Sequence, residues 1–185
     1  MYAAIANGGT IWQPTVARAI VQNNGSLIKS IEPKKLGDIG VKPSVINLLH
    51  DSLHEVTTYG TAASAFAGFP IATAGKTGTA QVFGRNANGT LKADTAWYAS
   101  FAPYKNPRYA VVLMVSQGGF GGGTAAVSVR KIYEAIFGVR GGTVNPELAL
   151  FKNDIPPMNL PRISPITKPK ASILNPNAGK AGLKK

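Results

Sequence analysis

Residues 71 to 82 read Ile71-Ala72-Thr73-Ala74-Gly75-Lys76-Thr77-Gly78-Thr79-Ala80-Gln81-Val82 and predict a β-strand with a single lysine, which we expect to be buried. Side chains alternate along a strand, so Lys76 and Gly78 should lie on one face and Thr77 and Thr79 on the other. Glycines on both sides of the lysine let a ligand or another backbone approach closely. An extended peptide can pair with such a strand edge, while a cation and two hydroxyls bind its carboxylate. The run therefore predicts a site for an anionic peptide.

Two other interpretations of this run are an ordinary edge strand with a solvated lysine and a phosphate-binding loop. Gly75-Lys76-Thr77 matches the end of the phosphate-loop pattern, but that pattern requires a glycine where this chain has Pro70. It also requires a helix directly after the lysine, whereas residues 81 to 84 predict more strand and then a turn. The phosphate loop is therefore disfavoured, and the edge strand stays open.

The composition indicates one globular domain followed by a basic tail. The chain has 185 residues, of which 44% are hydrophobic, and a formal net charge of +12. Residues 139 to 185 hold 8 of the 20 Lys and Arg residues and 7 of the 13 prolines, which predicts an extended, mobile arm. Cysteine is absent, which excludes a disulfide framework and a thiolate metal site. No apolar run reaches the ~18 to 20 residues of a membrane span, and nothing in these residues predicts export or anchoring.

Helical and strand patterns alternate along residues 1 to 138 and predict an α+β fold with an antiparallel sheet flanked by helices. Asn23-Asn24-Gly25 predicts a hairpin turn between strands at 15 to 21 and 26 to 31. Further strands are expected at 95 to 102 and 108 to 116. Two longer helices are expected at 43 to 58 and 124 to 137, after a short one at 1 to 6. The expected buried positions are Val45, Leu49, Leu53 and Val56 in the first longer helix, and Ala125, Val129, Ile132 and Ile136 in the second.

The lysine run, in this order of elements, resembles a known family. Lys76-Thr77-Gly78-Thr79 is similar to the third active-site motif of penicillin-binding proteins and serine β-lactamases. Residues 1 to 9, Gly60-Thr61-Ala62 and residues 96 to 103 resemble other segments of the same family. The resemblance covers residues 1 to 138 and is closest to class B transpeptidases of the elongation type, penicillin-binding protein 2. It implies the C-terminal portion of a transpeptidase domain, followed by the tail at 139 to 185.

The resemblance assigns roles to four residues and implies no metal or cofactor. Lys76 would hold the substrate carboxylate and support proton transfer, and Thr79 would donate its backbone N–H to the oxyanion. Thr77, Gly78 and Thr79 would bind the terminal carboxylate of a D-Ala-D-Ala stem peptide or of a β-lactam. One oxyanion donor typically contributes about 3 kcal/mol to transition-state stabilisation.

The family's serine nucleophile, its S-x-x-K lysine and its S-x-N motif have no match in the chain. Ser26 and Lys29 fit S-x-x-K, but on a predicted strand they point to opposite faces. Ser128 and Lys131 fit it on a predicted helix, where the lysine is expected to be solvated and a poor base. We therefore expect the isolated chain to be catalytically inert and the missing groups to lie in an upstream half of the domain.

The resemblance also implies partners and a location. It implies that the parent enzyme cross-links peptidoglycan through an acyl-serine intermediate, at the extracytoplasmic face of a bacterial cell membrane. The expected partners are the stem peptide, β-lactams, the upstream half of the domain and an elongation-complex glycosyltransferase, and not nucleic acid. Two alternatives stay open, namely a non-catalytic basic binding module and a penicillin-sensing receptor domain.

Two further motifs invite functional interpretations that the pattern disfavours. His50 and His54 are spaced as in the zinc helix H-E-x-x-H, but they fall outside the expected buried stripe and have no third ligand, so we expect a solvated helix face. Gly121, Gly123 and Ala126 match a dinucleotide-loop variant without the parallel strand and acid that it needs. Residues 118 to 123 are therefore expected to form a flexible loop beside the ligand edge.

Overall fold

The computed structural model describes residues 1 to 150, which fall into two compact units. The described part of the first unit comprises residues 1 to 12 and 35 to 150, and that of the second comprises residues 13 to 34. Each unit is considered by itself below. No helix in residues 1 to 150 combines the length and apolar character needed to cross a bilayer.

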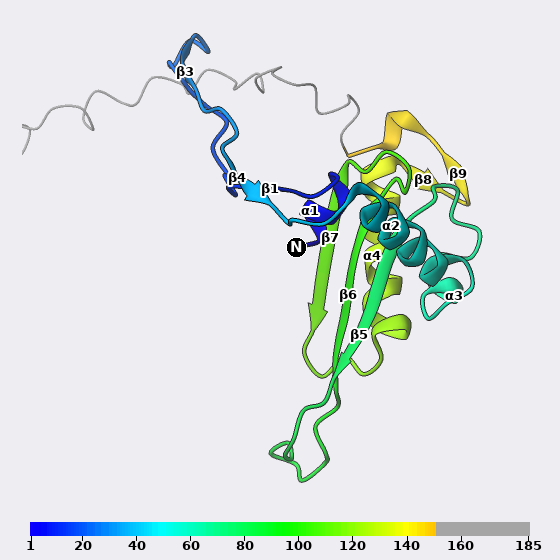
Figure 1. Cartoon of the computed structure of the whole chain (residues 1–185). Coiled ribbons are helices and arrows are strands. Elements are labelled where there is room, and N and C mark those ends of the chain that lie inside the picture. The colour runs from blue at the N-terminus through cyan, green and yellow to red at the C-terminus, as the bar shows by residue number, and fades with distance from the viewer. Residues whose placement is uncertain (151–185) are drawn as a thin grey trace, which may run out of the picture. The chain divides into compact units, whose positions relative to one another are not determined.

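A three-stranded antiparallel sheet forms the centre of the first unit (Figure 1). Its strands are β5 (Ala74–Ala80), β6 (Thr95–Ala102) and β7 (Tyr109–Val115), in that order, so β5 lies at an edge. The register pairs Lys76 with Ala99 and Thr79 with Ala96. The predicted α+β fold with an antiparallel sheet is confirmed.

The helix α4 (Ala126–Phe137) covers one face of this sheet, and the π-helical turn η1 (Gly121–Ala125) leads into it (Figure 1). The predicted buried positions of this helix are partly wrong, because Ile132 is exposed and Tyr133 is fully buried. The tyrosine can occupy the core because its hydroxyl lies 2.9 Å from that of Ser100 on β6. A polar group is buried at low cost only when it finds such a partner.

The helix α2 (Pro43–Thr58) has the predicted bounds, and the short α3 (Ala63–Phe66) follows it. Its predicted buried stripe is partly wrong, because Val45 and Leu49 are exposed, whereas Leu53 and Val56 are half-buried and pack against the core. The buried residues of α2 are Ile46 and Thr57. The buried face of α2 therefore includes polar side chains, which an analysis of hydropathy periodicity predicts to be exposed.

His50 and His54 lie on that inward face and are half-buried, so the prediction of a solvated histidine face is wrong. His50 Nε2 lies 2.8 Å from the carbonyl oxygen of Ile5, and His54 Nδ1 lies 2.7 Å from that of Thr73. A carbonyl oxygen only accepts, so each bonded ring nitrogen must carry a proton. The part of the chain that the structure describes has no group of three His, Cys, Asp or Glu residues suited to a metal ion.

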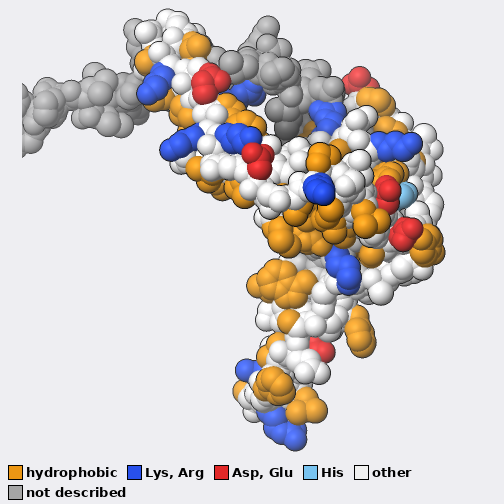
Figure 2. Space-filling model, viewed as in Figure 1, with side chains coloured by type: hydrophobic (Ala, Val, Ile, Leu, Met, Phe, Trp, Pro, Cys, Tyr) orange, Lys and Arg blue, Asp and Glu red, His pale blue; other side chains and the backbone are white. Residues whose placement is uncertain are grey.

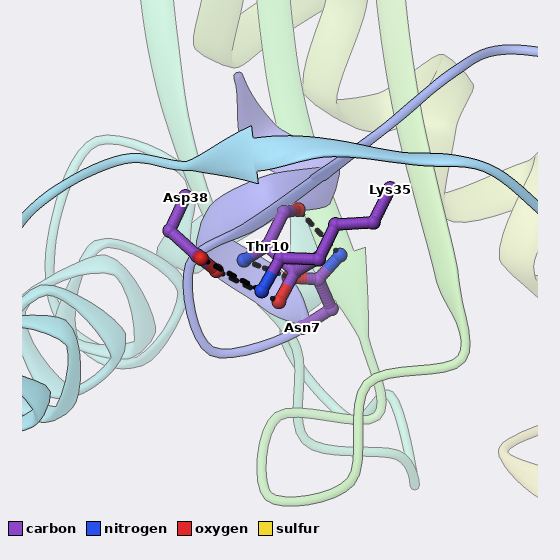
Figure 3. A network of polar contacts seen from close by, with 4 residues as sticks. All are labelled: Asn7, Thr10, Lys35 and Asp38. Atoms are coloured by element: carbon purple, nitrogen blue, oxygen red, sulfur yellow. Dashed lines mark hydrogen bonds and ion pairs between the residues drawn. The ribbon is translucent and has the colours of Figure 1, made fainter.

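A strand pair that the sequence did not predict joins α1 (Tyr2–Ala6) to the residues before α2. It consists of β1 (Thr10–Trp12) and β4 (Lys35–Asp38). Asn7 and Thr10 exchange side-chain and backbone hydrogen bonds of 3.0 and 2.9 Å (Figure 3). Thr10 Oγ1 donates to Asp38, which also forms an ion pair with Lys35 at 2.7 Å. Hydrogen bonding to Lys35 lowers the pKa of the Asp38 carboxyl.

The second unit contains the predicted hairpin. Its strands are β2 (Ala19–Val21) and β3 (Leu27–Ser30), which are shorter than expected and pair antiparallel. Gly25 in the turn has φ 87°, a left-handed value that glycine adopts without strain. The Asn-Gly turn signal was therefore sufficient to locate this hairpin.

The segment predicted as a basic tail begins with regular structure. Residues 139 to 150 form β8 (Val139–Arg140), β9 (Thr143–Val144) and η2 (Pro146–Leu148). The N–H of Leu150 donates to the carbonyl oxygen of Ala135, which ties this segment to α4. Residues 139 to 150 are therefore regular structure and not part of an extended arm, and the domain boundary expected at residue 138 remains a prediction. Residues 151 to 185 lie outside the described residues.

Candidate active-site strand

Lys76 lies in the middle of β5 with its side chain exposed, which contradicts the expectation of a buried lysine. Its Nζ donates a hydrogen bond of 2.9 Å to the carbonyl oxygen of Thr77. Packing requires glycine at position 75, directly before the lysine, because a Cβ there would come within 3.0 Å of the Tyr98 ring and hydroxyl. The lysine is thus a solvent-facing cation on a strand that is tightly packed at Gly75, near its first residue.

Thr77 is half-buried and forms a hydroxyl pair with Thr61, with 2.6 Å between the two oxygen atoms. Thr61 lies between α2 and α3, and the sequence placed it in a family-like segment without indicating this contact. Only one of the two hydroxyl protons is used within the pair. The other can be donated to an anion at this point of the strand.

Thr79 is exposed, and its Oγ1 accepts a hydrogen bond of 3.3 Å from the backbone N–H of Gly121. This bond uses a lone pair of the hydroxyl and leaves its proton for an acceptor. Lys76, Thr77 and Thr79 therefore offer a charge and two hydroxyl groups along one edge of the sheet.

The glycine-rich segment packs against β5, contrary to the flexible loop that we expected. A Cβ at Gly121 would come within 3.0 Å of the carbonyl oxygens of Gly78 and Trp97, and one at Gly122 within 3.0 Å of that of Thr61. These glycines allow η1 to lie directly against the sheet backbone. From sequence alone a run of glycines predicts a flexible loop, and only the structure shows which atoms lie beside each glycine.

Hydrogen bonds from α2 hold the chain directly before the first residue of β5. The carbonyl oxygen of Thr73 accepts from the Thr57 hydroxyl at 2.8 Å as well as from His54 Nδ1. The His54 ring stacks on Tyr104, with centroids 4.2 Å apart and an angle of 11° between the planes. The N–H of Tyr104 donates to the carbonyl oxygen of Ala72 at 2.7 Å. These contacts fix the chain just before the lysine, and the sequence signalled none of them.

Two buried tyrosines support the sheet behind the strand. Burial raises the pKa of the Tyr133 hydroxyl to about 12 and raises the pKa of Tyr98 further. Both hydroxyls are therefore neutral at ordinary pH, and they act in packing rather than as acids or bases.

Neither S-x-x-K match forms a serine–lysine pair like that of the family. Ser26 Oγ bonds to the side chain of Asn24, and Lys29 lies on strand β3. Ser128 Oγ donates to the carbonyl oxygen of Thr124 at 2.8 Å, and the Lys131 side chain is exposed.

Comparison with known proteins agrees with this geometry. A model of the penicillin-binding protein transpeptidase domain matches residues 1 to 136. The chain therefore belongs to the penicillin-binding protein transpeptidase family. Within the family, the relatives and structural neighbours place the chain with class B proteins of the penicillin-binding protein 2 type.

Two curated relatives show how much is shared. The peptidoglycan D,D-transpeptidase MrdA of Salmonella typhimurium is 40% identical over 88 residues, which are 43% of this chain and 14% of the relative. The Escherichia coli MrdA is 33% identical over 129 residues, or 63% of this chain and 20% of the relative. The chain thus spans a fifth or less of the length of these relatives.

Solved structures of the family have the same fold. Pseudomonas aeruginosa PBP2 superposes with a TM-score of 0.59 and 29% identity, covering 79% of this chain and 30% of that one. Penicillin-binding protein A of M. tuberculosis, solved as a ceftriaxone acyl-enzyme complex, gives a TM-score of 0.62 and 27% identity over 72% of this chain and 30% of that one.

Proposed function

We propose that this chain provides the carboxylate-binding strand of a peptidoglycan D,D-transpeptidase. The observation that supports the proposal best is the arrangement of Lys76, Thr77 and Thr79 along the exposed edge of β5, with both hydroxyls oriented by Thr61 and Gly121. Family membership and the MrdA relatives support the same reaction class.

In this proposal the strand binds a D-Ala-D-Ala stem peptide, or a β-lactam, by its terminal carboxylate. Lys76 contributes the charge, and the free hydroxyl protons of the Thr61–Thr77 pair and of Thr79 donate to the carboxylate oxygens. In an antiparallel pair, the N–H of every second residue points away from the partner strand. The N–H of Thr79 is proposed to point in this way and to donate to the oxyanion. Gly78 leaves room for the peptide to lie against the strand.

The rest of the reaction requires groups that these residues do not provide. A serine, activated by a desolvated lysine, would be acylated by the stem peptide with release of D-alanine. The amine of a stem peptide on a neighbouring peptidoglycan strand would then attack the acyl-serine and form the cross-link. We propose that serine and lysine come from a part of the transpeptidase domain outside these 185 residues, and that the site works at the extracytoplasmic face of a bacterial cell membrane.

The first test measures carboxylate binding by the chain itself. Nuclear magnetic resonance titration with D-alanyl-D-alanine should shift the backbone amide signals of residues 76 to 79. Lys76→Ala should weaken this binding at least about tenfold, because one charge-assisted contact contributes roughly 1.5 to 3 kcal/mol. Lys131→Ala is the control, since Lys131 is also exposed but lies on α4. Shifts confined to other residues, or equal binding by the two variants, would contradict the proposal.

The second test concerns the nucleophile. Mass spectrometry after incubation of the chain with penicillin should show an unchanged mass. A stable adduct would show that the chain has a nucleophile of its own, and the adduct's position would identify it.

A further inference from the structure

A polar pocket of about 450 Å³ lies between α2 and the turn that joins β6 to β7. It is lined by Asn47, His50, Asp51, Tyr104 and Lys105. The first three share one side of α2, because residues three and four positions apart are neighbours on a helix. Figure 2 shows acidic side chains and a histidine at the surface over α2. The volume lies in the range of about 300 to 1,000 Å³ that is typical of small-molecule sites.

Two walls of the pocket are held in place by contacts made outside it. His50 donates from Nε2 to the carbonyl oxygen of Ile5. Tyr104 stacks on the His54 ring, and its hydroxyl donates to one carboxylate oxygen of Asp51. Side chains that are already fixed lose little conformational freedom when a ligand binds. The pocket is therefore preorganised around His50, Asp51 and Tyr104.

The pocket presents charges of both signs. Asp51 uses one carboxylate oxygen for Tyr104, and its other oxygen can accept from a ligand. Lys105 is exposed and has an ammonium group with three protons to donate. The side-chain amide of Asn47 can both donate and accept. A ligand that matches these groups carries an ammonium group for Asp51 and a carboxylate for Lys105.

We propose that this pocket binds a zwitterionic dipeptide, with its ammonium group at Asp51 and its carboxylate at Lys105 and Asn47. A dipeptide fits better than a single amino acid, which would leave most of the 450 Å³ to water. The pocket shares no residue with Lys76, Thr77 and Thr79 on β5. It is thus a second peptide site that the proposed function does not require.

Other small ligands match the pocket less well. The hydroxyl groups of a neutral sugar could bond to Asp51 and Asn47, but they would leave Lys105 without an opposite charge. A phosphate ion would pair with Lys105 and meet the Asp51 carboxylate, and like charges in contact are unfavourable. A zwitterion satisfies both charges at once.

Nuclear magnetic resonance titration of the 185-residue chain with glycylglycine tests the proposal. The amide signals of Asn47, Asp51, Tyr104 and Lys105 should move together, with a dissociation constant in the millimolar range. N-acetylglycylglycine lacks the ammonium group, and glycylglycinamide lacks the carboxylate. Each should bind about two- to fivefold more weakly, as expected for the loss of one charged contact that water partly screens.

Variants assign each charge to its partner. Asp51→Asn should bind glycylglycine and N-acetylglycylglycine equally well, because it no longer attracts the ammonium group. Lys105→Gln should likewise lose the preference for glycylglycine over glycylglycinamide. Glu55→Gln on α2 and Lys131→Gln on α4 are the matched controls, since both residues are exposed outside the pocket, and both should keep the preferences of the unaltered chain. Circular dichroism checks that each variant folds.

Three results would overturn the proposed dipeptide site. They are the absence of shifts at the pocket residues, equal binding of the three peptides by the unaltered chain, and charge preferences that survive in both Asp51→Asn and Lys105→Gln. Tighter binding of N-acetylglucosamine than of glycylglycine would assign the pocket to a sugar instead. Shifts at the pocket residues without any at residues 76 to 79 on addition of D-alanyl-D-alanine would refute the proposed function of β5 and retain this second site.

Discussion

Replacing Gly121 with alanine should destabilise the protein, because this glycine lies directly against the strand that holds Thr79. An added Cβ would come within 3.0 Å of the carbonyl oxygens of Gly78 and Trp97, a separation that real Cβ atoms essentially never show. Both obstacles are backbone atoms, so no side chain can rotate away. Either η1 or the sheet must move.

Two opposing effects determine the magnitude. Overpacking of this kind costs about 1 to 3 kcal/mol, while replacement of glycine by alanine restricts the unfolded chain and contributes about 0.4 to 1 kcal/mol in the other direction. The net loss at Gly121 should be about 1 to 2 kcal/mol. Gly123 belongs to the same turn, and a Cβ there would meet no atom within 4 Å. Gly123→Ala should therefore stabilise the protein by the entropic contribution alone.

Urea unfolding of the two variants, followed by circular dichroism, measures the difference. With a typical slope of ~1 to 3 kcal/mol per molar urea, the unfolding midpoints should differ by about 0.5 to 3 M. The Thr79 amide signal should shift in Gly121→Ala and remain in place in Gly123→Ala. Equal midpoints for the two variants would refute the conclusion that η1 is packed against the strand backbone.

Three further changes test other parts of the structure. Thr57→Val removes the buried hydroxyl that donates to the Thr73 carbonyl oxygen and should lower the free energy of unfolding by about 1 to 2 kcal/mol, whereas Thr58→Val, at an exposed position, should change it by less than about 0.5 kcal/mol. Tyr133 has a folded pKa of about 12 against about 10 in the unfolded chain, so its contribution is complete below about pH 10 and falls as the pH rises toward 12. Urea titrations at about pH 9 and pH 11 should show a loss of stability that Tyr133→Phe reduces by roughly 1 kcal/mol, with the buried Tyr98 contributing to the remainder; a loss that Tyr133→Phe leaves unchanged would show that Tyr133 is not a source of it. Lys76→Ala should leave the unfolding midpoint unchanged, because the side chain is exposed, and a large shift would contradict a role in binding alone.

Local patterns predicted most of the elements that form the site. The strands β6 and β7 and the helix α2 were predicted nearly to the residue, because two-residue alternation, helical periodicity and Pro43 at the first helical position all act over a few residues. The lysine motif identified β5 in the same way. The roles of Lys76, Thr77, Gly78 and Thr79 remain predictions.

Contacts between distant residues were the part that local patterns could not predict. The hydroxyl pair of Thr61 and Thr77 and the bond from Gly121 to Thr79 join residues that are 16 and 42 positions apart. The pairing of β1 with β4 joins Thr10 to Asp38 across 28 positions. Such pairings depend on the packing of the whole unit. Local secondary-structure propensities carry no information about that packing.

The amino-acid sequence by itself determined the order of the two longer helices and of the strands of the central sheet, and the family to which the chain belongs, since both follow from short-range patterns and a local motif. Only the tertiary structure decided which side of α2 is buried and that the glycine turn packs against β5. It also decided that the Lys76 side chain is exposed. Burial is set by what the rest of the molecule places against a side chain, and polar groups such as His54 and Thr57 can be buried once they find backbone partners.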